Sequence, residues 1–368
     1  MTRIGIDARM MFFTGIGRHV YNLAKRLPLL DPETEYLIFI RPEDRARVDF
    51  AAANLRLVET IPTYYDMVEQ TRHRRILEAE KLDLLHVPHF NIPIFYHGRL
   101  VVTIHDLIQA KLPSQSTWKA QFKRLGYYFV IQQALRKARR VIAVSRFTRD
   151  DIVRTLGTAA DKIEVIHNGF DARFLRQPTG VAEGKAILEK YGLKPPFLLY
   201  VGLQSHHKNL ATLIEAMQQI HATHPQASLA LVGKHDDRYT PALQAQAQKL
   251  GLAEAVRFCG FVPDADLELL YGTAVAFVFP SLYEGFGIPP VEALAAGLPV
   301  ISSNAASLPE VLGDQATYFD PTDPADMAAK IGAVLVDPES HRPTGMPQFS
   351  WDKMAEQTLK TYRQVLAT

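Results

Sequence analysis

Short apolar runs alternate with stretches of helical periodicity along nearly the whole chain, and this alternation restricts the fold more than any other feature. The uninterrupted apolar run 275–279 is typical of a strand buried on both faces, as in parallel sheets covered by helices. The sequence therefore predicts an α/β fold with two Rossmann-like, doubly wound parallel sheets. Strands are expected at 3–8, 36–40, 55–58, 84–87, 101–104, 140–144, 163–166, 197–201, 228–232, 256–259, 275–279 and 299–301, and helices at 20–30, 117–137, 209–221, 240–250, 265–271 and 291–296.

The length of 368 residues suits two domains of ordinary size. Gly, Pro and charged residues accumulate at 170–196, so we expect a first domain at 1–175 and a second at 176–351. Helical periodicity at 349–366 predicts a final helix, assigned to the first domain at about 352–368. Its side chains available for burial are Trp351, Met354, Leu359, Tyr362 and Leu366. Its assignment to the first domain rests on the family resemblance described below.

The segment after the apolar run 275–279 carries the strongest chemical signal. Glu284 precedes a turn containing Gly285, Phe286 and Gly287, and Glu292 lies in the helix expected next. Backbone N–H groups in the turn and the helix dipole favour the binding of an anion. The two carboxylates can accept hydrogen bonds from hydroxyl groups. A sugar nucleotide has both kinds of group. The alternative is an ordinary turn and a glutamate that only interacts with the helix dipole.

Glu284-Gly-Phe-Gly with Glu292 resembles the Glu-x7-Glu signature of the retaining glycosyltransferases of family 4, which have the GT-B fold. The resemblance implies that Glu284 contacts donor-sugar hydroxyls, that amides of the glycine turn contact the phosphates, and that Glu292 binds the ribose. It also implies that the final helix returns to the first domain and that both domains line one cleft. Similar segments run from Arg3 to about Tyr362, and the overall likeness is to bacterial polysaccharide mannosyltransferases.

Lys208 follows the expected strand 197–201 and a glycine turn, directly before a helix. This arrangement brings an ammonium group to a phosphate, although a solvated lysine is the alternative. Family members often have an arginine shortly after the glycine, where this sequence has Leu203, so Lys208 is expected to carry most of the diphosphate charge. In similar enzymes the segment with Gly260 and Phe261 contacts the nucleobase.

Candidate residues in the first half follow the expected strands. Gly15, Gly17 and Arg18 lie where similar enzymes have a glycine-rich loop between donor phosphates and acceptor, although two glycines also suit an ordinary turn. His105 and Asp106 come directly after the strand 101–104, and the resemblance puts this histidine beside the transferred sugar. A capping or core histidine is the alternative.

His86 and His89 are acceptor-side candidates in the segment that follows 82–85. Their spacing resembles a zinc site superficially, but the sequence offers no matching set of Cys or carboxylate ligands. We therefore expect no metal and no cofactor, the sugar nucleotide being a substrate.

Charge is distributed unequally between the halves. Residues 1–176 hold 28 Lys and Arg against 19 Asp and Glu, and the remainder is acidic. Aromatic and basic residues mix at 119–140, which is typical either of a helix at an anionic membrane surface or of a buried helix with a solvated basic face. No nucleic-acid motif accompanies this charge, so no nucleic-acid partner is expected.

The single cysteine, Cys259, is expected as a core thiol in a strand. One cysteine cannot form a disulfide within the chain, so a reducing compartment is expected for the protein. The sequence shows no signal-peptide pattern and no apolar run of transmembrane length, so a cytoplasmic protein is expected, with peripheral contact at the inner membrane face left open.

Together these features predict a metal-independent, retaining hexosyltransferase that moves a sugar, with mannose from GDP-mannose as the preferred donor, to a saccharide or lipid-linked glycan acceptor. Donor phosphates would be neutralised by Lys208, and His105 would align the reacting centre. Two alternatives remain: a sugar-nucleotide 2-epimerase of the same fold, and a non-catalytic protein that binds nucleotides or glycans.

Overall fold

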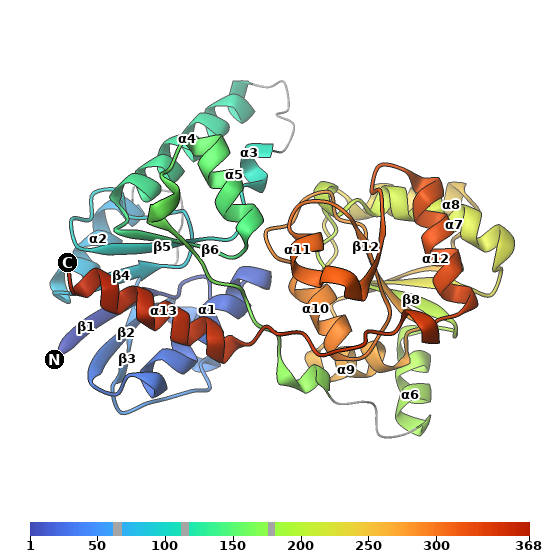
Figure 1. The fold of residues 1–368 in the computed structure, drawn as a ribbon, viewed down its shortest axis with the longest axis horizontal. Coiled ribbons are helices and arrows are strands. Elements are labelled where there is room, and N and C mark those ends of the chain that lie inside the picture. Colours follow the sequence, from blue (N-terminus) through green and yellow to red (C-terminus); the bar gives the residue numbers. More distant parts are fainter. Residues whose placement is uncertain (62–67, 112–117, 176–180) are drawn as a thin grey trace. The chain divides into compact units, whose positions relative to one another are not determined.

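The computed structural model describes residues 1–61, 68–111, 118–175 and 181–368. The chain divides into two compact units (Figure 1). Unit 1 comprises Met1–Gly169 with Phe349–Thr368, and unit 2 comprises Phe170–Gln348. The predicted boundaries lay a few residues later, after 175 and after 351. Each unit contains its own parallel sheet and its own buried core.

The sheet of unit 1 has the strand order β3-β2-β1-β4-β5-β6-β7, and all its pairings are parallel. Side chains of successive residues point to opposite faces of a strand. One face packs on α2, α4 and α5 around Leu85, Val102 and Ile131. The strands are β1 (Thr2–Asp7), β2 (Thr34–Ile40), β3 (Leu55–Glu59), β4 (Leu84–Val87), β5 (Leu100–Ile104), β6 (Arg140–Ala143) and β7 (Ile163–Val165). The helices are α1 (Thr14–Leu30), α2 (Arg74–Ala79), α3 (Ile108–Lys111), α4 (Trp118–Lys137), α5 (Arg146–Leu156) and α13 (Trp351–Leu366).

The sheet of unit 2 has the order β10-β9-β8-β11-β12-β13 and is also parallel. Helix α7 packs on α8 and α12, and α6 packs on α9. The strands are β8 (Phe197–Val201), β9 (Ser228–Val232), β10 (Val256–Gly260), β11 (Ala276–Phe279), β12 (Val300–Ser303) and β13 (Ala316–Phe319). The helices are α6 (Val181–Tyr191), α7 (Leu210–Thr223), α8 (Thr240–Lys249), α9 (Asp264–Thr273), α10 (Ile288–Ala295), α11 (Leu308–Leu312) and α12 (Pro324–Val336).

The predicted parallel-sheet architecture is confirmed, and every predicted strand is present, with its ends shifted by at most two residues. Some details were wrong. Helix α1 begins at Thr14, six residues before the predicted start, so Gly15 and Gly17 lie in its first turns. Strand β13 was not predicted, because it is a short edge strand whose first three residues are only partly buried. Helices α2, α3, α5, α6, α11 and α12 were also not predicted.

Helix α13 belongs to unit 1, on the face of the sheet opposite α4 (Figure 1). Its N-cap Ser350 accepts a hydrogen bond from the Lys353 amide, which fixes where the helix begins. A Cβ atom at Gly169 would lie 2.2 Å from the Trp351 nitrogen, so the two segments that leave unit 1 touch through their backbones. Of the expected buried residues, Leu366 is only partly buried, and Val365 is buried in its place.

None of the helices in the described part of the chain combines the length and the apolar character that crossing a membrane requires.

Candidate active site

Lys208 and Glu284 form an ion pair at the carboxyl edge of the unit 2 sheet. The Lys208 Nζ atom lies 2.5 Å from Glu284 Oε1, and the two side chains are 14% and 13% exposed. Lys208 ends a short 3-10 helix, His206–Lys208, in the loop after β8, and Glu284 lies in the loop after β11. Because β8 and β11 are hydrogen-bonded neighbours, their carboxyl ends bring these two predicted residues together. The ammonium also lies 5.3 Å from the centroid of the Phe279 ring, a cation–π contact.

Hydrogen bonds hold the two loops in place. The Leu282 amide donates to the His207 carbonyl at 2.8 Å, which ties the β11 loop to the β8 loop. The Ser307 hydroxyl donates to the Glu284 carbonyl at 3.0 Å, which fixes the backbone at the carboxylate from the other side. Neither Leu282 nor Ser307 was among the residues predicted for the site. Both contacts support the backbone segments that carry the ammonium and the carboxylate.

The glycine turn after Glu284 has a backbone that a side chain would disturb. Gly287 has φ +90°, and a Cβ atom there would lie 2.9 Å from Leu308 Cδ2. Helix α10 begins at the next residue, Ile288, and Pro289 and Pro290 follow in its first turn. Prolines have no N–H group, so the anion-binding donors expected at this helix end come from the turn itself and from Ile288.

Glu292 is buried within α10, with Pro290, Val291 and Ala293 beside it. A buried carboxylate is costly unless it has polar partners, and in such surroundings it is a strong acceptor for hydroxyl donors. The predicted role of Glu292 as ribose ligand stays a prediction.

Gly260 ends β10 with φ +67°, and its carbonyl accepts a hydrogen bond from the Gly233 amide at 2.9 Å. The His235 Nε2 atom lies 3.8 Å from the position of a Cβ atom at Gly260. Phe261 is exposed directly after this strand. The segment predicted to contact the nucleobase thus lies at the same carboxyl edge of the sheet as Lys208 and Glu284.

Two buried polar residues on these loops, Gln204 and Ser281, were not predicted. Within the described residues, Gln204 Nε2 and Ser281 Oγ are buried atoms without a hydrogen-bond partner. The Thr240 hydroxyl holds the other end of the Gln204 amide, donating to Oε1 at 2.6 Å. Buried donors of this kind usually have a partner, so both are candidates for contacts with a ligand. Their position directly after the apolar strands β8 and β11 is the signal that could have identified them.

In unit 1, His105 follows β5 and has a defined tautomer. Its Nε2 atom lies 3.1 Å from the Pro88 carbonyl oxygen, which can only accept, so Nε2 carries the proton and Nδ1 is an acceptor. Burial holds the pKa of His105 well below its usual value, helped by neighbouring histidines. The His105 ring also contacts the His19 ring edge to face, with 4.9 Å between the ring centroids. At neutral pH, His105 is therefore an uncharged hydrogen-bond acceptor.

His19 itself was not predicted. It is buried in α1, and its Nδ1 atom lies 2.8 Å from Asn168 Oδ1. Burial lowers the pKa of His19 to about 4. Its position four residues after Gly15 gave no separate signal in the sequence.

The two acceptor-side histidines lie in different surroundings. His86 is fully buried in β4 between Thr103 and Tyr362, each within hydrogen-bonding distance of one ring nitrogen. This is the position of a core histidine. His89 is partly buried after β4, and burial lowers its pKa to about 4. The Asp106 carboxylate accepts a hydrogen bond from the Ile108 amide at 2.9 Å and so caps the short helix α3.

The three residues expected in the glycine-rich loop also differ. A Cβ atom at Gly17 would lie 2.6 Å from the Met11 carbonyl oxygen, so packing within unit 1 already explains this glycine. Gly15 is exposed, and nothing lies within 4 Å of the corresponding position. Packing within unit 1 therefore does not require a glycine at position 15. Arg18 is partly buried on α1.

A buried ionic cluster at the carboxyl ends of β1 and β4 was also missed. The Arg9 guanidinium lies 2.7 Å from the Asp7 carboxylate and 2.5 Å from that of Glu69. Burial by itself would raise the pKa of Asp7, but the Arg9 charge outweighs it and holds this pKa well below its usual range. The Asn91 amide donates to Glu69 at 2.6 Å. Charged residues directly after a buried strand, Asp7 and Arg9, are the signal that could have indicated this cluster.

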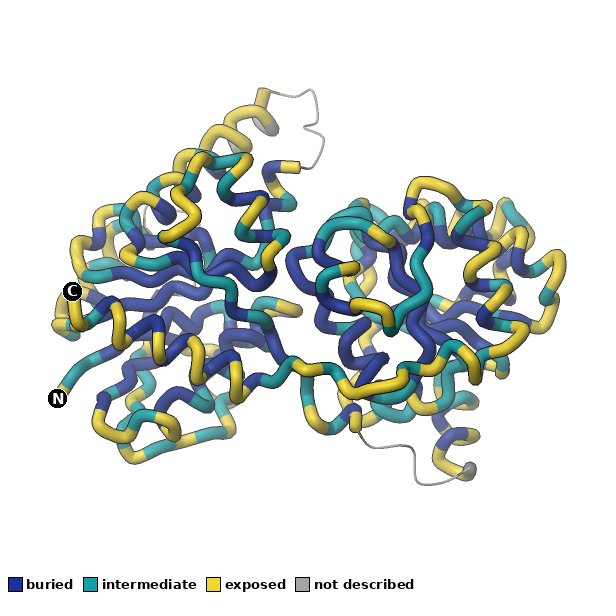
Figure 2. Tube along the Cα trace, viewed as in Figure 1, coloured by how far each residue is buried: buried dark blue, intermediate teal, exposed yellow. Residues whose placement is uncertain are grey.

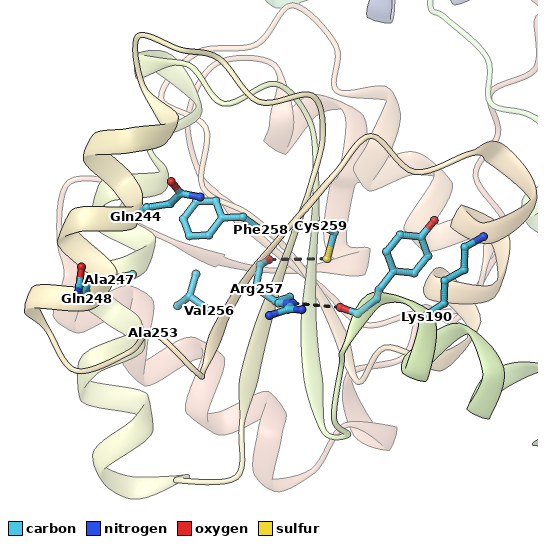
Figure 3. A pocket seen from close by; sticks show the side chains of 10 residues that line it. Lys190, Gln244, Ala247, Gln248, Ala253, Val256, Arg257, Phe258 and Cys259 are labelled. Atoms are coloured by element: carbon cyan, nitrogen blue, oxygen red, sulfur yellow. Dashed lines mark hydrogen bonds between the residues drawn. The ribbon is translucent and has the colours of Figure 1, made fainter.

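A cavity of about 480 Å³ lies beside the edge strand β10 (Figure 3). The Arg257 Nε atom donates to the Tyr191 carbonyl at 3.2 Å across it. Cys259 is half-buried here and not in a core, which corrects the prediction, and burial raises the pKa of its thiol to about 11. The lining contains none of the predicted donor residues. It consists of Lys190, Tyr191, Gln244, Ala247, Gln248, Ala253, Val256, Arg257, Phe258 and Cys259.

Comparisons with known proteins cover both units. The family described as Glycosyltransferase Family 4 matches residues 13–174, and that described as Glycosyl transferases group 1 matches residues 185–345. O-antigen chain mannosyltransferase B of Escherichia coli is 31% identical over 95% of this chain and 96% of its own length. O-antigen chain mannosyltransferase RfbU of Salmonella typhimurium is 29% identical over 77% of this chain and 74% of its own.

Solved structures share the fold over the full chain. Sucrose-phosphate synthase from Thermosynechococcus elongatus superimposes with a TM-score of 0.80 at 24% identity, covering 100% of both chains. Anabaena HepE, solved in complex with UDP and glucose, gives a TM-score of 0.77 at 20% identity and covers 99% of both chains. At these identities the likeness concerns the fold alone.

Proposed function

Because the chain belongs to the glycosyltransferases of group 1 and family 4 and has the GT-B fold, we propose that it is a retaining hexosyltransferase of polysaccharide biosynthesis. It moves mannose from GDP-mannose to a saccharide or lipid-linked glycan acceptor. The observation that carries the proposal is the Lys208–Glu284 pair at the carboxyl edge of the unit 2 sheet. The choice of mannose rests on the two O-antigen mannosyltransferases among the relatives.

Unit 2 supplies the donor contacts. The Lys208 ammonium and the amides of the glycine turn neutralise the diphosphate as it departs, which is usually the largest electrostatic task in such a transfer. The Glu284 carboxylate, held within 2.5 Å of that ammonium, accepts hydrogen bonds from sugar hydroxyls. Glu292 is assigned to the ribose, and Gly260 with Phe261 to the base. The proposed donor thus spans from β10 to β11, strands separated in the sheet by β9 and β8.

The reaction proposed is front-face displacement. The acceptor oxygen forms a bond to the anomeric carbon on the face from which the diphosphate leaves, and the bond from that carbon to the phosphate oxygen breaks. The departing phosphate oxygen takes the proton of the acceptor hydroxyl, so configuration is retained and no enzymic base is consumed. His105 is proposed to lie beside the sugar, where its unprotonated Nδ1 atom accepts a hydrogen bond from a sugar hydroxyl group.

Two measurements test this function. Thermal unfolding is recorded with GDP, UDP, ADP and dTDP sugars, because the bound nucleotide stabilises the folded state. Proton NMR of the product of GDP-[13C]mannose and a mannose-terminated oligosaccharide then gives the anomeric configuration, with and without EDTA. A β-linked product from this α-linked donor would show that the transfer is not retaining. Loss of activity in EDTA would show that the reaction requires a divalent ion.

Omitting the acceptor separates the alternatives. A transferase leaves the sugar of GDP-mannose unchanged, whereas a 2-epimerase converts it in the absence of acceptor. A protein that only binds would shift the unfolding temperature and release no nucleotide with any acceptor. The same panel identifies the donor if another sugar nucleotide is preferred.

A further inference from the structure

Helix α4 exposes four large apolar side chains. Trp118, Phe122, Leu125 and Phe129 are 66%, 67%, 65% and 56% exposed. They follow one another at intervals of four, three and four residues, so they form one stripe along the helix. Figure 2 shows the first half of α4 as mostly exposed, beyond the part of the helix that covers the sheet. A contiguous exposed apolar surface of this kind marks a site of interaction.

The stripe is not the face by which α4 packs on unit 1. The core face contains Tyr127, Ile131 and Leu135, all buried. Tyr127 lies nine residues after Trp118, which is two and a half turns at 3.6 residues per turn and so the opposite side of the helix. Helix α4 therefore has two apolar faces, and the sheet accounts for only one of them.

Charge around the stripe decides which partner fits. Residues 118–140 contain seven Lys and Arg and no Asp or Glu. Arg136 is exposed and lies five full turns after Trp118, on the side of the stripe. A second copy of this chain packing stripe to stripe would bring two such cationic helices together, which like-charge repulsion opposes. An anionic partner with an apolar interior has the complementary chemistry.

We propose that the outward face of α4 docks on a membrane surface containing anionic lipids. The aromatic and leucine side chains of the stripe enter the boundary between headgroups and acyl chains, and the flanking cations contact the headgroups. The helix lies in the plane of the interface and does not cross the bilayer. This docking surface is distinct from the donor residues, so it stands or falls independently of the proposed transfer reaction.

Tryptophan fluorescence offers a direct test, because the chain has two tryptophans, Trp118 in the stripe and Trp351 buried in unit 1. The full chain is mixed, without nucleotide, with vesicles of phosphatidylcholine alone or of phosphatidylcholine with phosphatidylglycerol. We expect a blue shift of the emission and co-sedimentation with the anionic vesicles only. Absence of both would overturn the proposal.

Variants assign the binding to this face. The triple variant Phe122→Ser/Leu125→Ser/Phe129→Ser should weaken partitioning into anionic vesicles by about tenfold or more. Arg136→Gln should lower both the partitioning and its dependence on salt. The control is Leu29→Ser, which removes a side chain 66% exposed on α1 and should leave partitioning unchanged. Circular dichroism and nucleotide-induced thermal shifts establish that the triple variant is folded.

Two results would contradict the proposal. Unchanged partitioning of the folded triple variant would place the lipid contact elsewhere. A wild-type chain that ignores vesicles but sediments as a dimer, with the triple variant a monomer, would make a second copy the occupant of this face. A failed transfer assay has no bearing on either result, since vesicle binding is measured without donor.

Discussion

The Nδ1 atom of His86 lies 2.5 Å from the Tyr362 hydroxyl oxygen, and the two residues are 276 positions apart in the sequence. Both side chains are fully buried, and the second ring nitrogen of His86 lies 2.8 Å from the Thr103 hydroxyl. The contact joins the central strand β4 to the last helix of the chain. A polar residue of the sheet is thus satisfied only when α13 is in place.

Replacing Tyr362 by Phe should destabilise unit 1 by about 1–3 kcal/mol, because one ring nitrogen of a buried histidine loses its partner. Urea unfolding followed by tryptophan fluorescence measures this, since Trp118 and Trp351 both lie in unit 1. Tyr318→Phe is the control: its partly exposed hydroxyl bonds the Gly313 carbonyl in unit 2, and the tryptophan signal should not change. Equal stability of Tyr362→Phe and wild type would mean that the contact contributes nothing.

Unit 1 should lose stability when the pH falls from about 6.5 towards 4. Burial lowers the pKa of His19 and of His89 to about 4, below the value of about 6.5 in an unfolded chain. In this window the unfolded chain binds protons that the folded unit does not, so each such histidine costs about 1.4 kcal/mol per pH unit. Urea unfolding across this range should show the decline, and a smaller one for His89→Asn. A free energy of unfolding that stays constant down to about pH 5 would contradict the prediction.

Lys208→Gln should lower kcat/KM for transfer by about 100-fold to 1000-fold, because the charge that neutralises the diphosphate is lost. The nucleotide-induced thermal shift should decrease as well. Lys249→Gln is the matched control, because Lys249 is an exposed lysine at the C-terminal end of α8, in the same unit. Transfer by Lys208→Gln at the wild-type rate would remove this residue from the mechanism.

Gly287→Ala should destabilise unit 2 by about 1–3 kcal/mol, through its positive φ and through overlap with Leu308. Gly297→Ala separates the two causes: Gly297 has φ +74°, but nothing lies within 4 Å of an added Cβ atom there. We expect a smaller loss for Gly297→Ala in urea unfolding followed by circular dichroism. Equal losses would show that packing against Leu308 has no effect.

Most of the architecture follows from local sequence, because the buried parallel strands are mainly apolar. Strands such as β8 and β11 have this character and were found within one residue of their ends. Helices α5 and α12 were missed although each has a capping signal, Ser145 for the first and Asp323 before Pro324 for the second. An edge strand such as β13 is only partly buried and has no comparable pattern.

The candidate site divides in the same way. Glu284 and Lys208 could be predicted because each lies in the loop that follows a buried strand, where ligands bind in parallel sheets, and because the segment of Glu284 resembles a family signature. The position of His86 could not, because its partner is Tyr362, far along the chain. Similarly, the two apolar faces of α4 give no clear amphipathic pattern, so its outward stripe becomes visible only when the core face is known.

The composition of unit 1 from both ends of the chain has a consequence for biosynthesis. Domains generally fold in the order in which they leave the ribosome. Here the first segment, Met1–Gly169, lacks α13 until Trp351–Leu366 has been synthesised, whereas Phe170–Gln348 is by then already complete. The unit encoded second is therefore able to mature first, while the face of the nascent N-terminal sheet that carries α1 still lacks the cover that α13 provides.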